Sequence, residues 1–524
     1  MEKVEKIAVR IMAVLGTGVM LFLTFYSWKY TKRIFPSDFF QDEKDSILWN
    51  LVCSAVILAV AGASALYLRK ASEKTLHIAA VICAAVTALF CMKIARDAGT
   101  YCVADQYQSF AVAEAFFTGD TEWLQTSEYH KMYPFQLGLS WIYALFFRIA
   151  GRADNGVIQS AQALCAGMML YAGFHIVRRL SHSRAAEAFY LLMAMLFAPM
   201  YCYVLFIYGE TIGTCSAMCA VWFWLEANRT DRTAGSKWGY WGAAIAMLAV
   251  MYVARSGLLV VWIAMLIMQL LLSMRRKRWK GIVLVCAALA VMLFTSYLLR
   301  GAAEKTVGTK YDSGAPYVSW VAMGMQETDP GRGPGVYNGY NVVTYEKADG
   351  NPAEASAIAE EYIAGRWQEW MQNPAQMYRF LKEKMLFQWI EPTYGGFKET
   401  GYLEEPKPWI DRCYNGEWNA GLLAFLNRYQ AVLYLFVLGY FLMILAEKLE
   451  GEQILPGIIL LGGFFFTMIW EAKSRYVYPY IVLILPCAAC SIAYYSGLMT
   501  EQLKKLGRVI KGRKQKQKEI GKTA

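Results

Sequence analysis

The chain has 524 residues, of which 57% are hydrophobic and 18% are charged, and its mean hydropathy is +0.29. This composition excludes an ordinary soluble domain, because apolar stretches of about 17–25 residues, the length that crosses a bilayer, recur along most of the chain. The net charge of +11 gathers in short clusters beside these stretches. We therefore expect the basic residues to mark one membrane surface rather than a nucleic-acid partner.

Apolar stretches in the sequence predict about twelve transmembrane helices, with boundaries uncertain by several residues. They lie near residues 7–28, 48–68, 77–94, 157–177, 185–206, 208–226, 238–254, 257–273, 281–299, 428–446, 455–470 and 475–496. The first stretch is too long for a signal-peptide core and lacks a cleavage site, so we expect it to be retained.

Basic clusters fall in alternate connections between these stretches, and this pattern sets the topology. They lie near residues 3–10, 69–74, 178–184, 229–237, 275–280 and 504–522. The positive-inside rule then places both termini in the cytoplasm. The apolar segment 134–151 is too short to fit this alternation as a full span. We interpret it as a re-entrant or interfacial helix on the outer face, and a short true span is the alternative.

This topology divides the chain into five regions. They are an additional N-terminal helix pair (1–76), a transmembrane module (77–300) with a first outer loop (95–156), a large outer loop (301–427), C-terminal transmembrane helices (428–498) and a basic cytoplasmic tail (499–524). Within the large outer loop, helical spacing of aromatic residues predicts a helical stretch over about 352–389.

Asp105 directly follows the third predicted span and opens a polar segment at the outer surface. Ionisable groups beside a bilayer are costly and usually functional. A carboxylate there is able to take the proton of an acceptor hydroxyl as a general base. The alternative is that Asp105 only caps the helix that follows. Asp38 and Asp97 are competing outer acids, but neither is followed by the Tyr133-Pro134 element.

Several cations and polar residues accompany this acid in the sequence. His130 and Lys131 precede Tyr133 and Gln136, and Arg475-Tyr476 joins the last two predicted spans. A bidentate guanidinium suits a phosphate. The alternatives are that Lys131 only extends toward lipid headgroups and that Arg475 is an anchor paired with Glu471.

Two further charged residues, Glu210 and Arg255, stand at the outer ends of predicted spans. They are candidates for substrate binding, and the alternative is that both are boundary residues without a role in the site.

Taken together, these motifs resemble the first outer loop of polytopic glycosyltransferases of the C-type fold. The resemblance is closer to bacterial members of the protein mannosyltransferase-like family, which use polyprenyl-phosphate sugars. It implies that Asp105 is the catalytic base, that a basic residue before Pro134 contacts the lipid phosphate, and that the late Arg475-Tyr476 pair belongs to the site. Segments 320–325 and 335–338 also resemble elements near the active face of the family. The first two predicted spans have no counterpart in this resemblance.

The sequence thus predicts an all-α polytopic membrane protein with about twelve transmembrane helices and two large extracytoplasmic loops. The resemblance implies an inverting glycosyltransferase on the outer face of a bacterial cytoplasmic membrane. Its expected partners are a polyprenyl-phosphate sugar donor, membrane lipids, and a cell-envelope glycan, lipid or protein acceptor. We expect no cofactor and no required metal, since nucleotide-binding motifs are not found and Asp105 and Glu114 do not share a helical face. The alternatives are a transporter or flippase of lipid-linked glycans and a non-enzymatic cell-envelope scaffold.

Overall fold

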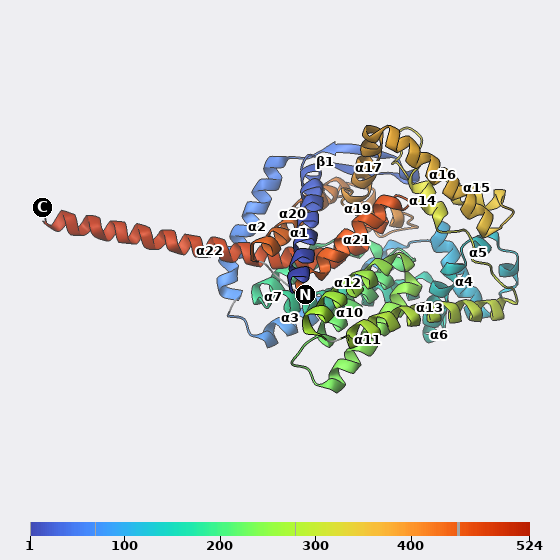
Figure 1. Ribbon diagram of the computed structural model, residues 1–524, viewed down its shortest axis with the longest axis horizontal. Helices are drawn as coiled ribbons and strands as arrows, with labels where there is room; N and C mark the ends of the chain where they lie inside the picture. Colours follow the sequence, from blue (N-terminus) through green and yellow to red (C-terminus); the bar gives the residue numbers. More distant parts are fainter. Residues whose placement is uncertain (1, 69, 278, 448–450, 524) are drawn as a thin grey trace.

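The computed structural model describes residues 2–68, 70–277, 279–447 and 451–523, and within them the chain is almost entirely helical (Figure 1). Nine helical segments in these ranges are long and apolar enough to cross a membrane. They belong to α1 (Glu2–Ser27), α2 (Ile47–Leu68), α3 (Glu73–Ala98), α7 (Asn155–Ser181), α12 (Leu259–Arg276), α13 (Lys280–Val307), α20 (Asn419–Glu447), α21 (Leu455–Ile469) and α22 (Tyr478–Thr523). The prediction of an all-α polytopic membrane protein is therefore confirmed, with the count of twelve as an approximation.

The remaining three predicted spans have a different local structure. The stretch predicted as one helix over 185–206 is broken into α8 (Arg184–Leu196) and the short α9 (Pro199–Tyr203). Pro199 stands in the first turn of α9. Proline has no N–H to continue a preceding helix but is well accommodated where a new helix begins, so the chain breaks here. The other two stretches form α10 (Gly209–Ala227) and α11 (Ala234–Ala254), which pack along each other.

The short apolar segment within the first outer loop forms η3 (Pro134–Gln136) and α6 (Leu137–Ala150). A helix of 14 residues rises about 21 Å, which is less than the roughly 30 Å of a hydrocarbon core. It packs against α4 (Ala104–Thr118) and also contacts α13. This length is short for a straight span, and whether 134–151 re-enters the membrane or crosses it stays a prediction.

The N-terminal helix pair packs into the same hydrophobic core as the rest of the molecule. Met20 and Leu23 of α1 are fully buried in that core. Helix α1 lies along α20, and the approach is so close that a Cβ added at Gly16 would lie 2.2 Å from the ring of Phe441. Helix α2 packs against α20 and α22. The pair is thus an integral part of the bundle.

The large outer loop carries its own short helices and joins the N-terminal pair. Its elements are α14 (Val318–Gly324), α15 (Tyr340–Lys347), α16 (Pro352–Gln372), α17 (Pro374–Trp389), α18 (Gly396–Thr400) and α19 (Pro408–Tyr414). The predicted helix over 352–389 is interrupted at Asn373, whose side chain caps α17 and precedes Pro374. The N-terminal pair adds an antiparallel hairpin, β1 (Tyr30–Ile34) and β2 (Phe40–Lys44), which the sequence analysis did not predict.

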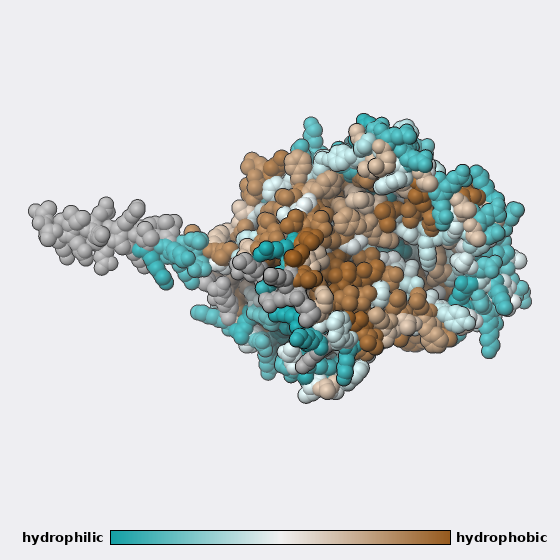
Figure 2. All heavy atoms as spheres, viewed as in Figure 1, coloured by the Kyte–Doolittle hydropathy of each residue, from teal (hydrophilic) through white to brown (hydrophobic). Residues whose placement is uncertain are grey.

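Polar and apolar surfaces separate along the molecule. In Figure 2, apolar residues gather in the middle of this face, and hydrophilic residues cover the right-hand end where α15 and α16 lie. The C-terminal part of α22 projects from the body at the left (Figure 1). Two of the predicted basic residues, Arg69 and Arg278, lie outside the described residues, as do the side chains of most of the tail.

Candidate active site

Asp105 lies in the first turn of α4, with its carboxylate in contact with two other segments. The N-cap is Val103, and no side chain caps the helix, so the capping alternative for Asp105 is wrong. Tyr129 donates a hydrogen bond from its hydroxyl to Asp105 Oδ1 (2.9 Å), and Arg475 Nη2 donates to Oδ2 (3.2 Å). The side chain of Asp105 remains 34% exposed. It is therefore both held in place and accessible.

The backbone immediately before this aspartate is unusual. Ala104 has φ 46°, in the left-handed region that residues with a Cβ rarely adopt. Such a conformation costs on the order of 1–3 kcal/mol and is retained where the surroundings impose it, often at functional sites.

Arg475 is the centre of the charged cluster. It lies in η6 (Ser474–Tyr476), the connection between α21 and α22, and its side chain is only 6% exposed. Its guanidinium contacts Asp105 (3.2 Å), Glu399 (3.4 Å) and Glu210 (3.9 Å). The alternative that Arg475 pairs with Glu471 is wrong, because Glu471 instead pairs with Lys473 and accepts a hydrogen bond from Tyr476.

Glu210 and Arg255 also belong to this cluster. Glu210 is in the first turn of α10, and Arg255 connects α11 to η4 (Ser256–Leu258). Arg255 Nη2 lies 3.0 Å from Glu210 Oε1. Glu210 is fully buried and contacts both guanidiniums, which argues against a simple boundary role for either residue.

Two aromatic rings lie against both arginines. The guanidinium of Arg255 is 5.4 Å from the ring centroid of Tyr208 and 5.0 Å from that of Tyr476. The guanidinium of Arg475 is 5.4 Å and 5.6 Å from the same two centroids. Cation–π attraction of this kind favours guanidiniums over ring faces and lets both cations share the same rings.

Hydrogen-bonding capacity in the cluster is left unused. Within the described parts of the chain, Arg475 Nε and both carboxylate oxygens of Glu210 are buried without a hydrogen-bond partner. Buried polar atoms are nearly always paired, so exceptions often mark functional sites. The cluster holds one more acid than cations: Asp105, Glu210, Glu399 and Glu471 against Arg255, Lys473 and Arg475.

The electrostatics of this cluster keep Asp105 ionised. Burial alone raises the pKa of its carboxyl, but Arg475 and Lys473 act in the opposite direction and hold the pKa below its usual value. Burial, with Tyr208 and Asp105 nearby, raises the pKa of Tyr129 far above its ordinary range. Tyr129 therefore stays protonated and acts as a hydrogen-bond donor to an ionised Asp105.

The Tyr-Pro motif reaches the aspartate through Tyr129. Gln136 donates from Nε2 to the Tyr129 hydroxyl (2.8 Å), which in turn donates to Asp105. The Tyr133 hydroxyl accepts a hydrogen bond from Asn341 Nδ2 (2.8 Å), and it thereby ties the first outer loop to α15. Gln136 thus orients the partner of Asp105, while Tyr133 holds the surrounding loop.

The two basic residues before Pro134 lie apart from the charged cluster. His130 is 1% exposed, contacts Ser127 Oγ through Nδ1 (2.7 Å), and burial lowers its pKa to about 4. It is neutral at neutral pH and supplies no cation. Lys131 forms a surface ion pair with Glu128 (2.8 Å), and no contact between it and Asp105 or Arg475 is found in the described structure.

The segments that resemble family elements in the large loop lie beside Arg475. Ala472 N donates to Gly335 O (2.7 Å), and Gly335 N donates to Gln326 O (3.0 Å). Gly335 has φ 71°, and a Cβ there would lie 2.6 Å from Gly324 O, so the close approach requires glycine. Trp320 stacks on Trp470 with centroids 6.0 Å apart. The outer loop therefore supports the connection that carries Arg475.

Sequence reasoning missed three residues of the cluster. Glu399 lies in α18, in a loop with many acids, and the sequence offers no signal that distinguishes it. Lys473 is two residues before Arg475 and is 17% exposed, and Tyr129 directly precedes His130. Lys473 and Tyr129 are close in sequence to predicted site residues. Their proximity to Arg475 and to the Tyr-Pro motif was the signal that could have identified them. Glu114, by contrast, is exposed on α4.

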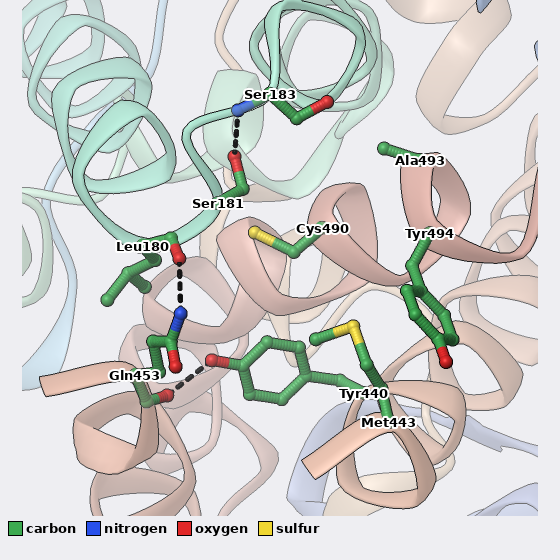
Figure 3. Close-up of a pocket in the computed structure, with 9 residues that line it drawn as sticks. All are labelled: Leu180, Ser181, Ser183, Tyr440, Met443, Gln453, Cys490, Ala493 and Tyr494. Atoms are coloured by element: carbon green, nitrogen blue, oxygen red, sulfur yellow. Dashed lines mark hydrogen bonds between the residues drawn. The ribbon is translucent and has the colours of Figure 1, made fainter. Parts of the chain in front are cut away.

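A separate cavity of about 340 Å³ lies beside the C-terminal end of α7 (Figure 3). Its lining comes from the last turn of α7, from α20, η5 (Gly451–Ile454) and α22, and includes Ser181, Tyr440, Gln453 and Cys490. None of the candidate site residues lines it. The charged cluster and this cavity are thus distinct places in the fold.

Comparisons with known proteins bear on the segment that contains α6 to α13. Residues 136–299 match the model of the family described as dolichyl-phosphate-mannose-protein mannosyltransferase. No curated protein matches the chain.

Among the solved structures similar to this chain are two of ArnT from Cupriavidus metallidurans. One is bound to undecaprenyl phosphate (12% identity, 79% of this chain and 77% of that chain) and the other is in the apo state (11%, 79% and 76%), each with a TM-score of 0.33. Similarity at this level carries no argument about the mechanism of this chain. The family match over residues 136–299 agrees with the resemblance to protein mannosyltransferase-like glycosyltransferases, and it lies between the motifs at Asp105 and at Arg475 rather than over them.

Proposed function

We propose that this membrane protein is an inverting glycosyltransferase that uses a polyprenyl-phosphate-linked sugar as donor. The observation that carries the proposal is the Asp105–Arg475 contact, in which an accessible carboxylate meets a buried guanidinium. A base and an anion-binding cation side by side are the two groups that sugar transfer from a lipid phosphate requires. The match to a glycosyltransferase family over residues 136–299 supports the same reaction class.

In this reaction Asp105 accepts the proton of an acceptor hydroxyl as its oxygen attacks the anomeric carbon. The bond between that carbon and the phosphate oxygen breaks, and the polyprenyl phosphate leaves with both bonding electrons. Attack from the face opposite the phosphate inverts the anomeric centre. Tyr129 fixes the orientation of the carboxylate through its 2.9 Å hydrogen bond.

The departing phosphate gains negative charge, which Arg475 and Arg255 stabilise in this proposal. Glu210 lies near both guanidiniums, and both also lie against the rings of Tyr208 and Tyr476. Their two positive charges are therefore close together. Charge-assisted hydrogen bonds from a guanidinium fork match a phosphate well. We retain Lys131 and His130 only as secondary candidates, because Lys131 is paired with Glu128 and His130 is neutral.

The orientation of the helices supports action on the outer face. The site is built just beyond the end of α3 and at or before the beginnings of α10, α12 and α22, whereas α10 is followed by Arg229 and Arg232 and α12 ends in Arg275-Arg276. By the positive-inside rule these basic ends face the cytoplasm. The site then faces the outside of a bacterial cytoplasmic membrane, with both termini inside and a cell-envelope glycan, lipid or protein as acceptor.

Transfer from a panel of radiolabelled polyprenyl-phosphate sugars tests the proposal, with membranes that contain wild type or Asp105→Asn at equal protein levels. Wild type should transfer one of the sugars, and Asp105→Asn should lose about 10²- to 10⁴-fold of the rate, the usual contribution of a general base. The matched control is Glu114→Gln, an exposed acid on the same helix, which should keep wild-type activity. Equal transfer by wild type and Asp105→Asn would remove Asp105 from the mechanism.

A lipid-linked glycan transporter is the second candidate, because it would use the same cations. Flux of labelled lipid across vesicles without sugar transfer would favour it. The grouping of the charged cluster at helix ends, rather than at the middle of spans, favours the transferase instead.

A further inference from the structure

Lys473, the third cation of the charged cluster, has a single carboxylate partner among the described residues. Its Nζ lies 3.0 Å from Glu471 Oε1, and its side chain is 17% exposed. Arg475, by comparison, is 6% exposed and lies near three carboxylates. An ammonium carries three N–H donors. One ion pair therefore leaves Lys473 with donors that an incoming ligand is able to use.

The ammonium of Lys473 lies close enough to Asp105 for each group to shift the pKa of the other. Burial lowers the pKa of Lys473, but Glu471 and, more weakly, Asp105 raise it above its usual value. Lys473 in turn helps Arg475 to lower the pKa of Asp105. The ring of Tyr337 in the large outer loop lies 5.2 Å from the same ammonium. Lys473 thus stays charged and lies beside both the base and the outer loop.

Glu471, the partner of Lys473, has other neighbours that stabilise its charge. The Tyr476 hydroxyl donates a hydrogen bond to Glu471 Oε2 (2.9 Å). The fully buried Lys384 of α17 donates from Nζ to Gly324 O (2.6 Å). Burial lowers the pKa of Lys384 to about 7, and the nearby charge of Glu471 opposes this shift. A buried carboxylate without any partner is costly, but Glu471 keeps Tyr476 and the Lys384 charge if Lys473 turns away.

We propose that Lys473 is a ligand of the donor phosphate and that it exchanges Glu471 for the phosphate when the donor binds. Lys473 is the N-cap residue of η6, and Arg475 lies within the same short connection. One segment thereby supplies a flexible point charge and a guanidinium fork to the same headgroup. The inference rests on the proposed function and deepens it, because it names the residue through which the site first meets the lipid phosphate.

Equilibrium binding of a polyprenyl phosphate to the full-length protein tests this contact, with the polyprenol of the same length as the neutral ligand. Lys473→Gln should weaken binding of the phosphate about tenfold or more and leave binding of the alcohol within about twofold, since a hydrogen bond to a charged group is lost. The matched control is Lys347→Gln, an exposed lysine on α15, which should leave both affinities unchanged. Equal phosphate binding by wild type and Lys473→Gln would overturn the inference.

Glu471→Gln distinguishes an exchange of partners from a purely structural ion pair. Loss of either partner of a structural pair removes the same contact, so both single variants should then change phosphate binding in the same direction. An exchange predicts opposite effects. Lys473→Gln weakens binding, whereas Glu471→Gln should tighten it about threefold or more, because no carboxylate then competes for the ammonium. Unchanged or weaker binding by Glu471→Gln would contradict the exchange.

The double variant separates a direct contact from the field of a distant charge. Charges that act only through their fields contribute independently, so Glu471→Gln would then tighten binding equally with and without Lys473. In an exchange, Glu471→Gln should change binding by less than about twofold in the Lys473→Gln background, since no ammonium is left to release. Equal tightening in both backgrounds would reject a direct contact of Lys473 with the phosphate.

Protein level and the midpoint of thermal unfolding are measured for every variant. If Lys473→Gln does not accumulate, Glu471→Gln is compared with the double variant, in which both partners are neutral. The double variant should bind the phosphate about tenfold more weakly or worse, and equal binding would overturn the inference. Transfer by wild type, with phosphate binding that Lys473→Gln does not weaken, would reject this inference alone. Absence of transfer by wild type with every donor would instead reject the proposed function, and this inference with it.

Discussion

Arg475 Nη2 lies 3.2 Å from Asp105 Oδ2, so a guanidinium from the last interhelical connection neutralises the carboxylate that follows the third membrane helix. A carboxylate paired with a cation is a weaker base than a free one. In the proposed reaction a donor phosphate competes with Asp105 for the N–H groups of Arg475. Donor binding would then free Asp105 and increase its basicity at the point where the acceptor proton is transferred.

Lys473→Gln should shift the pH dependence of transfer. Burial raises the pKa of Asp105, but Arg475 and Lys473 lower it more, so the acid limb of kcat/KM in wild type should lie below the ordinary value of about 3.9. Removing the Lys473 charge removes one of these two cations, and the limb should move to higher pH. The carboxylate's contribution to stability is present above its unfolded pKa and is lost as pH falls through the lower folded value.

Profiles of kcat/KM against pH for wild type, Lys473→Gln and Lys131→Gln measure this shift. Lys131 pairs with Glu128 at the surface, so its variant serves as a loss of one positive charge outside the cluster. An acid limb at the same pH in wild type and Lys473→Gln would contradict the electrostatic account of Asp105.

Arg475→Lys should reduce kcat/KM at least tenfold. Lysine keeps the charge but lacks the planar fork that lets one side chain contact Asp105, Glu399 and Glu210 together. Arg475→Ala should in addition lower the free energy of unfolding by up to about 3–5 kcal/mol, because it removes a cation from Glu399 and leaves the buried Glu210 with Arg255 alone. Transfer assays and thermal unfolding in detergent check both. Wild-type activity in Arg475→Lys would mean that only the charge matters.

Tyr129→Phe should lower kcat about 10- to 100-fold. The lost hydroxyl fixes the orientation of the Asp105 carboxylate through its hydrogen bond to Oδ1, and a base displaced by about 1 Å can lose on the order of 100-fold in rate. Steady-state kinetics measure the effect. The control is Tyr378→Phe, a 60% exposed tyrosine on α17. A change of less than twofold in Tyr129→Phe would show that Asp105 does not depend on this hydrogen bond.

Lys131→Gln should change the KM for donor by less than about twofold. The resemblance implies a phosphate contact for a basic residue at this position, whereas the ammonium here pairs with Glu128 on the surface. Donor titrations with wild type and Lys131→Gln distinguish a phosphate contact of Lys131 from a surface ion pair. A rise of tenfold or more would restore the role that the sequence motif implies.

Local patterns in the sequence predict the helices and single residues of the site better than the contacts between those residues. Asp105 and Arg475 are predicted because each lies beside an apolar stretch at the same membrane surface and because the motifs around them resemble those of the glycosyltransferase family. Their contact joins residues 370 positions apart, which no local pattern reports. Glu399 was missed for the same reason, since only tertiary packing brings α18 to Arg475.

The hairpin at residues 30–44 was missed because its signals are weak. Its connection, Phe35-Pro36-Ser37-Asp38, lacks the Asn-Gly or Asp-Gly pair that marks a tight hairpin. Its pairing is instead supported by tertiary contacts, such as those of buried Lys32 with Asp42 and Glu383. The break at Pro199, by contrast, had a visible signal that the strong apolar character of the stretch outweighed.

Tyr208 and Tyr476 each lie against both Arg255 and Arg475. Two like charges are thereby brought together during folding, before any anion arrives. A site assembled in this way needs little rearrangement to receive an anion, and the ordering cost of its side chains is met in advance. Its selectivity would then depend on the fixed spacing of the two guanidiniums, which favours anions large enough to contact both at once.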